Sequence, residues 1–109
     1  MNQAILDVFK NGLLTADEVT GRRVLEVGAY DVNGSVRPIV EALDPASYLG
    51  VDIASGPGVD EAVSCDNLIA RFGTGLFGVV ITTEMLEHVE DWRACVANLA
   101  GVTARDGLL

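Results

Sequence analysis

The sequence has few of the residues on which several common kinds of protein depend. Among its 109 residues there are only 7 Lys and Arg against 16 Asp and Glu, and the formal net charge is −9. A surface of this sign repels phosphate backbones, so we expect no affinity for nucleic acid or for anionic lipid. A small ligand that is neutral or cationic suits this charge better.

Cysteines and long apolar stretches are also scarce. Cys65 and Cys95 are too few and too far apart in sequence for a disulfide framework or a zinc cluster, so we expect two reduced, partly buried thiols. The longest apolar stretches, around Gly78 to Ile81, fall far short of the roughly 18 residues of a membrane span. Because the first residues, MNQAILDVFK, lack a basic start followed by an apolar block, we expect no secretory signal and a cytoplasmic protein.

Strand and helix patterns alternate along the chain. Apolar residues at helical spacing predict a leading helix from about residue 3 to 14, within a leading segment 1–20 in which Gly12 is a weak point. Apolar runs predict buried strands at 24–27, 48–53 and 77–83 and a brief strand at 61–63. Further helical stripes begin at the candidate N-caps Ser35, Asp66 and Asp91, and the last two are expected to end at Gly73 and Gly101.

This alternation predicts an α/β fold, a doubly wound Rossmann-like parallel sheet covered on both faces, in a single domain spanning 1–109. Only about seven residues separate Ile53 from the third strand, so an irregular loop is expected where a crossover helix would need a dozen or more. The final segment, ARDGLL, is typical of the approach to a fifth strand. We therefore expect either a fragment truncated at that strand or a homodimer formed through the open sheet edge.

A candidate ligand site lies where the first strand ends, because such sheets bind ligands beyond the carboxyl ends of their strands. Gly28 and Gly34 allow the backbone to turn sharply and to approach a ligand, beside a helix that offers its N-terminal amides. Asp52 closes the second strand, where a carboxylate can accept hydrogen bonds from both hydroxyls of a ribose. Asp66 either caps the short helix or faces the amino group of an adenine.

The charges around this site distinguish two kinds of nucleotide ligand. The diphosphate of a dinucleotide would meet Glu26, Asp31 and Glu84, and the fingerprint G-x-G-x-x-G is absent because Tyr30 occupies the place of its second glycine. A nucleotide-dependent oxidoreductase is therefore the less favoured alternative. S-adenosylmethionine carries a sulfonium and an ammonium against one carboxylate, so it is net cationic and suits an acidic rim.

Four segments, VLEVGAYDVNG, YLGVDI, CDNL and FGVVITTEMLEHV, resemble the successive motifs of class I S-adenosylmethionine-dependent methyltransferases. The resemblance covers residues 22–109 and is greatest to the small-molecule group called methyltransferase type 11. It implies methyl transfer to a small-molecule acceptor. A non-catalytic Rossmann-like domain that mediates assembly is kept as an alternative.

The resemblance also implies roles for individual residues. Glu26 and Gly28 would serve the methionine end of the cofactor, Asp52 the ribose, and Asp66 with Asn67 or Leu68 the adenine. The full set of residues expected to bind the cofactor is Glu26, Gly28, Ala29, Tyr30, Gly34, Asp52, Ile53, Asp66, Asn67 and Glu84. The first motif departs from the family pattern at Tyr30, which replaces a glycine, and in a longer loop to Gly34.

Glu84, Glu87 and His88 form the pattern E-x-x-E-H after the fourth predicted strand. On a helix the three side chains would share one face and could hold a divalent cation. Related metal sites usually take a second histidine from later in the chain, whereas this sequence has one. We therefore expect no metal, with Glu84 bordering the cofactor and His88 orienting the loop or acting as a general base.

Overall fold

The computed structural model describes residues 2–32, 34–83, 85–86 and 89–109. It contains one parallel sheet with the strand order β3-β2-β1-β4-β5. The strands are β1 (Arg23–Val27), β2 (Ser47–Asp52), β3 (Glu61–Ala62), β4 (Phe77–Ile81) and β5 (Thr103–Leu108). This order reverses direction between β1 and β4, as expected for a doubly wound sheet.

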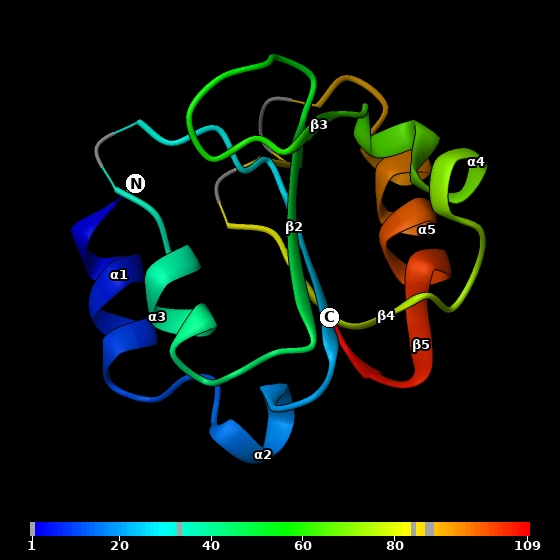
Figure 1. Ribbon diagram of the computed structural model, residues 1–109. Helices are drawn as coiled ribbons and strands as arrows, with labels where there is room; N and C mark the ends of the chain where they lie inside the picture. Colours follow the sequence, from blue (N-terminus) through cyan, green and yellow to red (C-terminus); the bar gives the residue numbers. More distant parts are fainter. Residues whose placement is uncertain (1, 33, 84, 87–88) are drawn as a thin grey trace.

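Helices cover both faces of the sheet (Figure 1). On one side lie α1 (Gln3–Lys10) and α3 (Arg37–Glu41), and on the other lie α4 (Leu68–Phe72) and α5 (Trp92–Val102). The short α2 (Ala16–Val19) precedes β1, and a 3-10 turn, η1 (Cys65–Asn67), precedes α4. None of the helices in the described part of the chain is long and apolar enough to cross a membrane.

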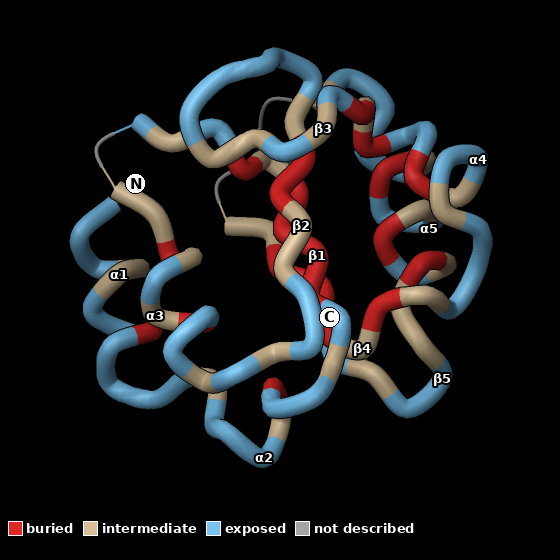
Figure 2. The backbone as a smooth tube through the Cα atoms, in the orientation of Figure 1, coloured by how far each residue is buried: buried red, intermediate tan, exposed pale blue. Residues whose placement is uncertain are grey.

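Each face of the sheet has its own apolar core, because successive strand residues point to opposite faces. Leu25 and Val27 of β1 pack on the α5 side with Leu68 and Leu99. Val24 of β1 belongs to the second core, on the α1 and α3 side, with buried residues that include Phe9, Val36 and Val40. Figure 2 shows the buried positions concentrated along the central strands and on the inward sides of the helices.

The predicted strands and the irregular loop before β3 are confirmed, whereas several details of the helices differ. The leading segment forms two helices, because the chain leaves α1 at Asn11 and Gly12 adopts a left-handed φ of 89°. Asp91 is confirmed as the N-cap of α5, its Oδ1 accepting the Ala94 N–H at 3.1 Å, but this helix continues one residue past Gly101.

The caps expected at Ser35 and Asp66 are displaced. Val36 is the N-cap of α3, while the Ser35 hydroxyl accepts the Arg37 N–H at 3.0 Å. Asp66 lies inside η1 and accepts a hydrogen bond from the Ser64 hydroxyl. Trp92, the first residue of α5, is 51% exposed, and the Arg93 guanidinium lies over its ring.

The expectation of two reduced thiols is also wrong, because Cys65 and Cys95 form a disulfide. Their Cα atoms lie 5.1 Å apart, on η1 and α5 respectively, and both residues are buried. The pairing joins positions 30 residues apart, which become neighbours only when α5 packs against η1. Sequence spacing contains no information about that contact.

Candidate functional site

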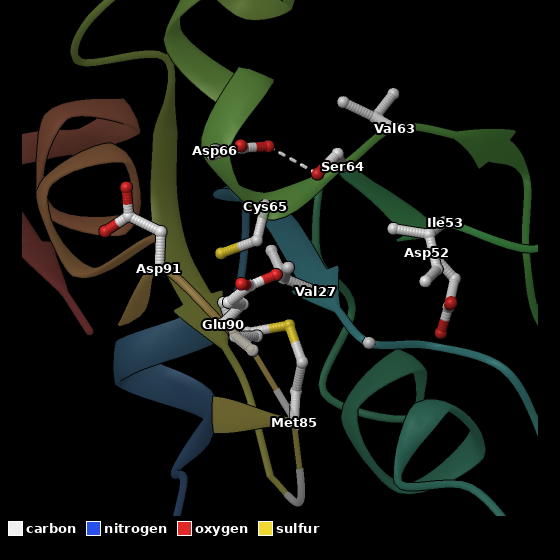
Figure 3. Close-up of a pocket in the computed structure, with 12 residues that line it drawn as sticks. Val27, Asp52, Ile53, Val63, Ser64, Cys65, Asp66, Met85, Glu90 and Asp91 are labelled. Carbon is white, nitrogen blue, oxygen red and sulfur yellow. Dashed lines mark hydrogen bonds between the residues drawn. The ribbon is translucent and has the colours of Figure 1, made fainter. Parts of the chain in front are cut away.

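A cavity opens at the carboxyl ends of β1 and β2 (Figure 3). Its volume of about 600 Å³ is usual for a small-molecule site. It lies on the α5 side of β1, since Val27 lines it. The other lining residues come from the turn after β1, from the end of β2, from the segment before α4 and from the segment before α5. They are Gly28, Asp52, Ile53, Val63, Ser64, Cys65, Asp66, Met85, Val89, Glu90 and Asp91.

Gly28 begins the loop after β1 and brings bare backbone to the cavity. Its φ is 83°, and a Cβ at this position would lie 2.9 Å from the Cβ of Met85. A larger residue would therefore be strained and would displace Met85. The loop also touches the 53–60 segment, where Tyr30 packs against Gly56 and the Ala29 carbonyl lies 2.6 Å from a Cβ placed on Gly58.

Five backbone amides of this loop already have partners within the protein. The Gly28 and Ala29 N–H groups donate to the Val51 carbonyl at 2.9 and 3.0 Å, and the Tyr30 N–H donates to Asp52 Oδ2 at 3.1 Å. Further along the loop, the Asp31 N–H donates to the Pro57 carbonyl at 2.7 Å, and the Gly34 N–H donates to Asp31 Oδ1 at 2.9 Å. A diphosphate binds most readily to free amides. Gly28 thus gives a ligand close approach but no free donor.

Asp52 is half-buried at the end of β2 and is held by backbone donors on both carboxylate oxygens. Oδ2 accepts the Tyr30 N–H and Oδ1 accepts the Ala54 N–H at 3.3 Å. Each oxygen keeps acceptor capacity, because a carboxylate offers about four lone-pair directions. Asp52 lines the cavity, so its remaining lone pairs are available to a hydrogen-bond donor there.

Four carboxylates line the cavity, those of Asp52, Asp66, Glu90 and Asp91, and no Lys or Arg does so among the residues that the structure describes. The remaining lining is largely apolar, including Ile53, whose side chain is 77% exposed at the mouth. An apolar cavity with an acidic rim favours a ligand that combines an apolar ring with positive charge.

Glu26 lies apart from this cavity although it is next to Val27 in sequence. Its carboxylate faces the opposite side of β1, where it is 2% exposed and accepts the Tyr48 hydroxyl at 2.7 Å. Burial raises the pKa of Glu26 above its ordinary value of 4.5, while the Tyr48 hydrogen bond and the Arg37 charge oppose that rise. Its contact with the methionine end of a cofactor stays a prediction.

The structure therefore brings four predicted residues, Gly28, Asp52, Ile53 and Asp66, to one cavity. Outside its lining lie Glu26, Ala29, Tyr30, Gly34 and Asn67. Glu84, Glu87 and His88 lie outside the described residues, so the predicted general base and the alternative metal site stay predictions. Among the described residues no group of His, Cys, Asp and Glu is arranged to hold a metal ion.

Sequence reasoning missed the wall that follows β4. Met85, Val89, Glu90 and Asp91 line the cavity, although only Asp91 was singled out, as a helix cap. Their position after the carboxyl end of a central strand is the signal that could have found them. Sequence reasoning also missed Val63 and Ser64 on the opposite wall. The same signal could have found them, since they follow the carboxyl end of β3.

Comparison with known proteins supports the fold. No family model and no curated protein matches the chain. A crystal structure of the trans-methyltransferase CalH in complex with SAH is similar, with a TM-score of 0.58 and 19% sequence identity. The match covers 81% of this chain and 31% of that protein, so the chain spans about a third of its length. This similarity confirms the expected Rossmann-like fold, which the chain shares with the CalH structure.

Proposed function

We propose that the chain binds S-adenosylmethionine and contributes to methyl transfer onto a small-molecule acceptor. The observation that carries this proposal is the cavity itself, whose walls hold four carboxylates beside a loop with occupied amides. A net cationic adenosyl compound suits these walls, and a diphosphate does not. The similarity to a methyltransferase structure bound to SAH supports the same conclusion. The narrower assignment to the type 11 group is part of this proposal.

Within the cavity the described residues divide the work by chemistry. Asp52 accepts the ribose hydroxyls, Ile53 lies against the adenine ring, and Asp66 accepts from the adenine amino group. Gly28 lets the ligand approach the backbone opposite Met85. The bound cofactor supplies an activated methyl group, and transfer then depends mainly on holding the acceptor in line at near-attack distance. His88 is the proposed base for an acceptor that must lose a proton.

Thermal unfolding with separate ligands tests the proposal. S-adenosylhomocysteine at 100 times its Kd should add about 2.7 kcal/mol to the free energy of unfolding. For a domain of this size such a gain raises Tm by several degrees. NADH at the same concentration should have no effect. Stabilisation by NADH alone would instead favour the oxidoreductase, and stabilisation by neither compound would contradict both assignments.

A second candidate function, assembly with another copy of the chain, is favoured by a groove of about 570 Å³ along β4. Its lining is almost entirely apolar and includes Val80, Ile81 and Leu108. The described pairing between β4 and β5 stops at Val79 and Leu108, which leaves the later part of β4 without β5 beside it. The buried Thr82 Oγ1, also in this groove, has no hydrogen-bond partner among the described residues. A strand from a second copy would supply one and cover the apolar edge.

A further inference from the structure

The disulfide between Cys65 and Cys95 lies in the wall of the cavity. Cys65 lines the cavity between Ser64 and Asp66, and Figure 3 shows its side chain drawn with the other lining residues. Cys95 is in the first turns of α5, four residues after Asp91, which lines the facing wall. The disulfide therefore joins the segment that carries Asp66 to the helix that carries the opposite rim.

The disulfide joins η1 to α5, and one described hydrogen bond joins α4, which follows η1, to α5. Asn98 Oδ1 accepts the Ile69 N–H at 2.9 Å, and the Asn98 amide donates to the Ala94 carbonyl at 2.9 Å. Ile69 also packs against Gly101, where an added Cβ would meet its side chain. These contacts keep the two helices together without the disulfide, so its loss would loosen the cavity wall rather than unfold the domain.

We propose that this disulfide is a thiol–disulfide exchange site whose state is coupled to occupation of the cavity. The inference rests on the proposed function, because the occupant is taken to be an adenosyl ligand. The oxidised chain has a fixed wall and binds that ligand more tightly, and the reduced chain binds it more weakly. Because coupling between two equilibria is reciprocal, the ligand in turn makes the disulfide harder to reduce.

The substrate of the exchange is a dithiol reductant. One thiolate of the dithiol attacks the Cys65 sulfur, the S–S bond breaks, and Cys95 leaves as a thiolate that takes up a proton. The second thiol of the reductant then attacks the reductant sulfur that is bonded to Cys65. This step closes the reductant's disulfide and releases Cys65 as a thiolate, which takes up a proton. The protein gains two electrons and two protons, and the dithiol becomes a disulfide.

Access decides which sulfur is attacked. Cys65 retains 6% exposure and lines the cavity, whereas Cys95 is fully buried. A reductant therefore reaches the bond through the cavity, where an adenosyl ligand would block its path.

A redox titration of the unmodified chain tests the coupling. The protein is equilibrated with mixtures of reduced and oxidised dithiothreitol, with and without saturating S-adenosylhomocysteine, and alkylated thiols are counted by intact mass. We expect no labels on the oxidised chain, two on the reduced chain, and a midpoint ratio about 10-fold more reducing with the ligand, within the usual range of such couplings. An unchanged midpoint, or two labels without any reductant, would overturn the proposal.

Calorimetric titration completes the cycle and separates this inference from the proposed function. Reduced protein should bind S-adenosylhomocysteine more weakly by the same factor by which the midpoint moves. The double variant Cys65→Ser with Cys95→Ser should bind like reduced protein and should not respond to dithiothreitol. Equal affinity of oxidised and reduced wild-type protein would overturn the coupling alone, whereas no binding to either form would overturn the proposed function as well. Both readouts use wild-type protein, so they do not depend on the variant folding.

Discussion

The two faces of the sheet are held by different chemistry. On the α1 and α3 side, Tyr48 donates a hydrogen bond to the buried Glu26, and the partly exposed Arg37 pairs with Asp60 at 2.8 Å. On the α5 side, the described core is apolar apart from the disulfide, and it opens into the acidic cavity. Buried polar groups need partners, so the first face specifies a unique packing.

On the cavity face the acidic side chains lie at the surface of a cavity, whereas Glu26 on the other face is buried. The carboxylates of the cavity lie at an open rim, where water or a ligand can satisfy them, and Asp52 is the only one of them with backbone donors on both oxygens. Under the proposed function, Asp52 and Asp66 serve a ligand, whereas Glu26 serves the fold through its hydrogen bond with Tyr48. Substitutions on each side should therefore separate stability from binding.

The largest expected effect is on ligand binding by Asp52→Asn. If Asp52 accepts both ribose hydroxyls as proposed, the loss of its charge weakens hydrogen bonds worth about 1.5–3 kcal/mol each, so affinity for S-adenosylhomocysteine should fall about 100-fold. Calorimetric titration measures the change. Asp17→Asn, on the exposed surface of α2, is the matched control and should bind normally. Unchanged affinity of the Asp52 variant would remove the cavity from the proposal.

On the other face, Tyr48→Phe should lower the free energy of unfolding by about 2 kcal/mol at neutral pH, because it leaves the buried Glu26 carboxyl without its donor. Binding of S-adenosylhomocysteine should not change. Tyr30→Phe, at a side chain that is 43% exposed, is the control and should alter stability by less than about 0.5 kcal/mol. Chemical denaturation measures both variants, and equal effects would show that the buried pair has no special role.

A smaller effect, seen only as a dependence on pH, is expected for Glu26→Gln. Because burial raises the pKa of Glu26, the folded chain holds this proton more tightly than the unfolded chain does. The resulting stability is present below the ordinary value of 4.5 and is lost as the pH rises through the folded pKa. Glutamine does not titrate. From pH 4 upward, the free energy of unfolding of the variant should therefore rise relative to that of the wild type, as measured by chemical denaturation at each pH. A difference between the two proteins that does not change with pH would contradict the assignment.

The smallest expected effect on stability comes from Leu108→Lys, which tests the β4 groove. Leu108 is 37% exposed, so the free energy of unfolding should change by less than about 0.5 kcal/mol. A charge at this edge should convert a dimer of the wild-type chain into monomers, as measured by light scattering. Val8→Lys, on the exposed side of α1 and outside the groove, should leave the dimer intact. A wild-type chain that is already monomeric would contradict assembly through this edge.

Local patterns predicted much of this molecule. The β-branched run from Phe77 to Ile81 and the short stretch ending at Val27 are strands in the structure, because their apolar character reflects burial on both faces of a parallel sheet. The absence of a helix between β2 and β3 followed from chain length alone. Asp52 was found as a cavity residue because the end of a parallel strand is a position that sequence can identify.

What the sequence determined by itself was therefore the order of strands and helices, the acidic character and the edge of the sheet at which a ligand would bind. Only the tertiary structure decided that Glu26 turns to Tyr48, 22 residues away, and that Cys65 reaches Cys95. It also decided that five amides of the loop after β1 have partners and that residues after β4 line the cavity. Periodicity is a local property of the chain, whereas these contacts depend on which elements pack together, and many pairings are compatible with the same local pattern.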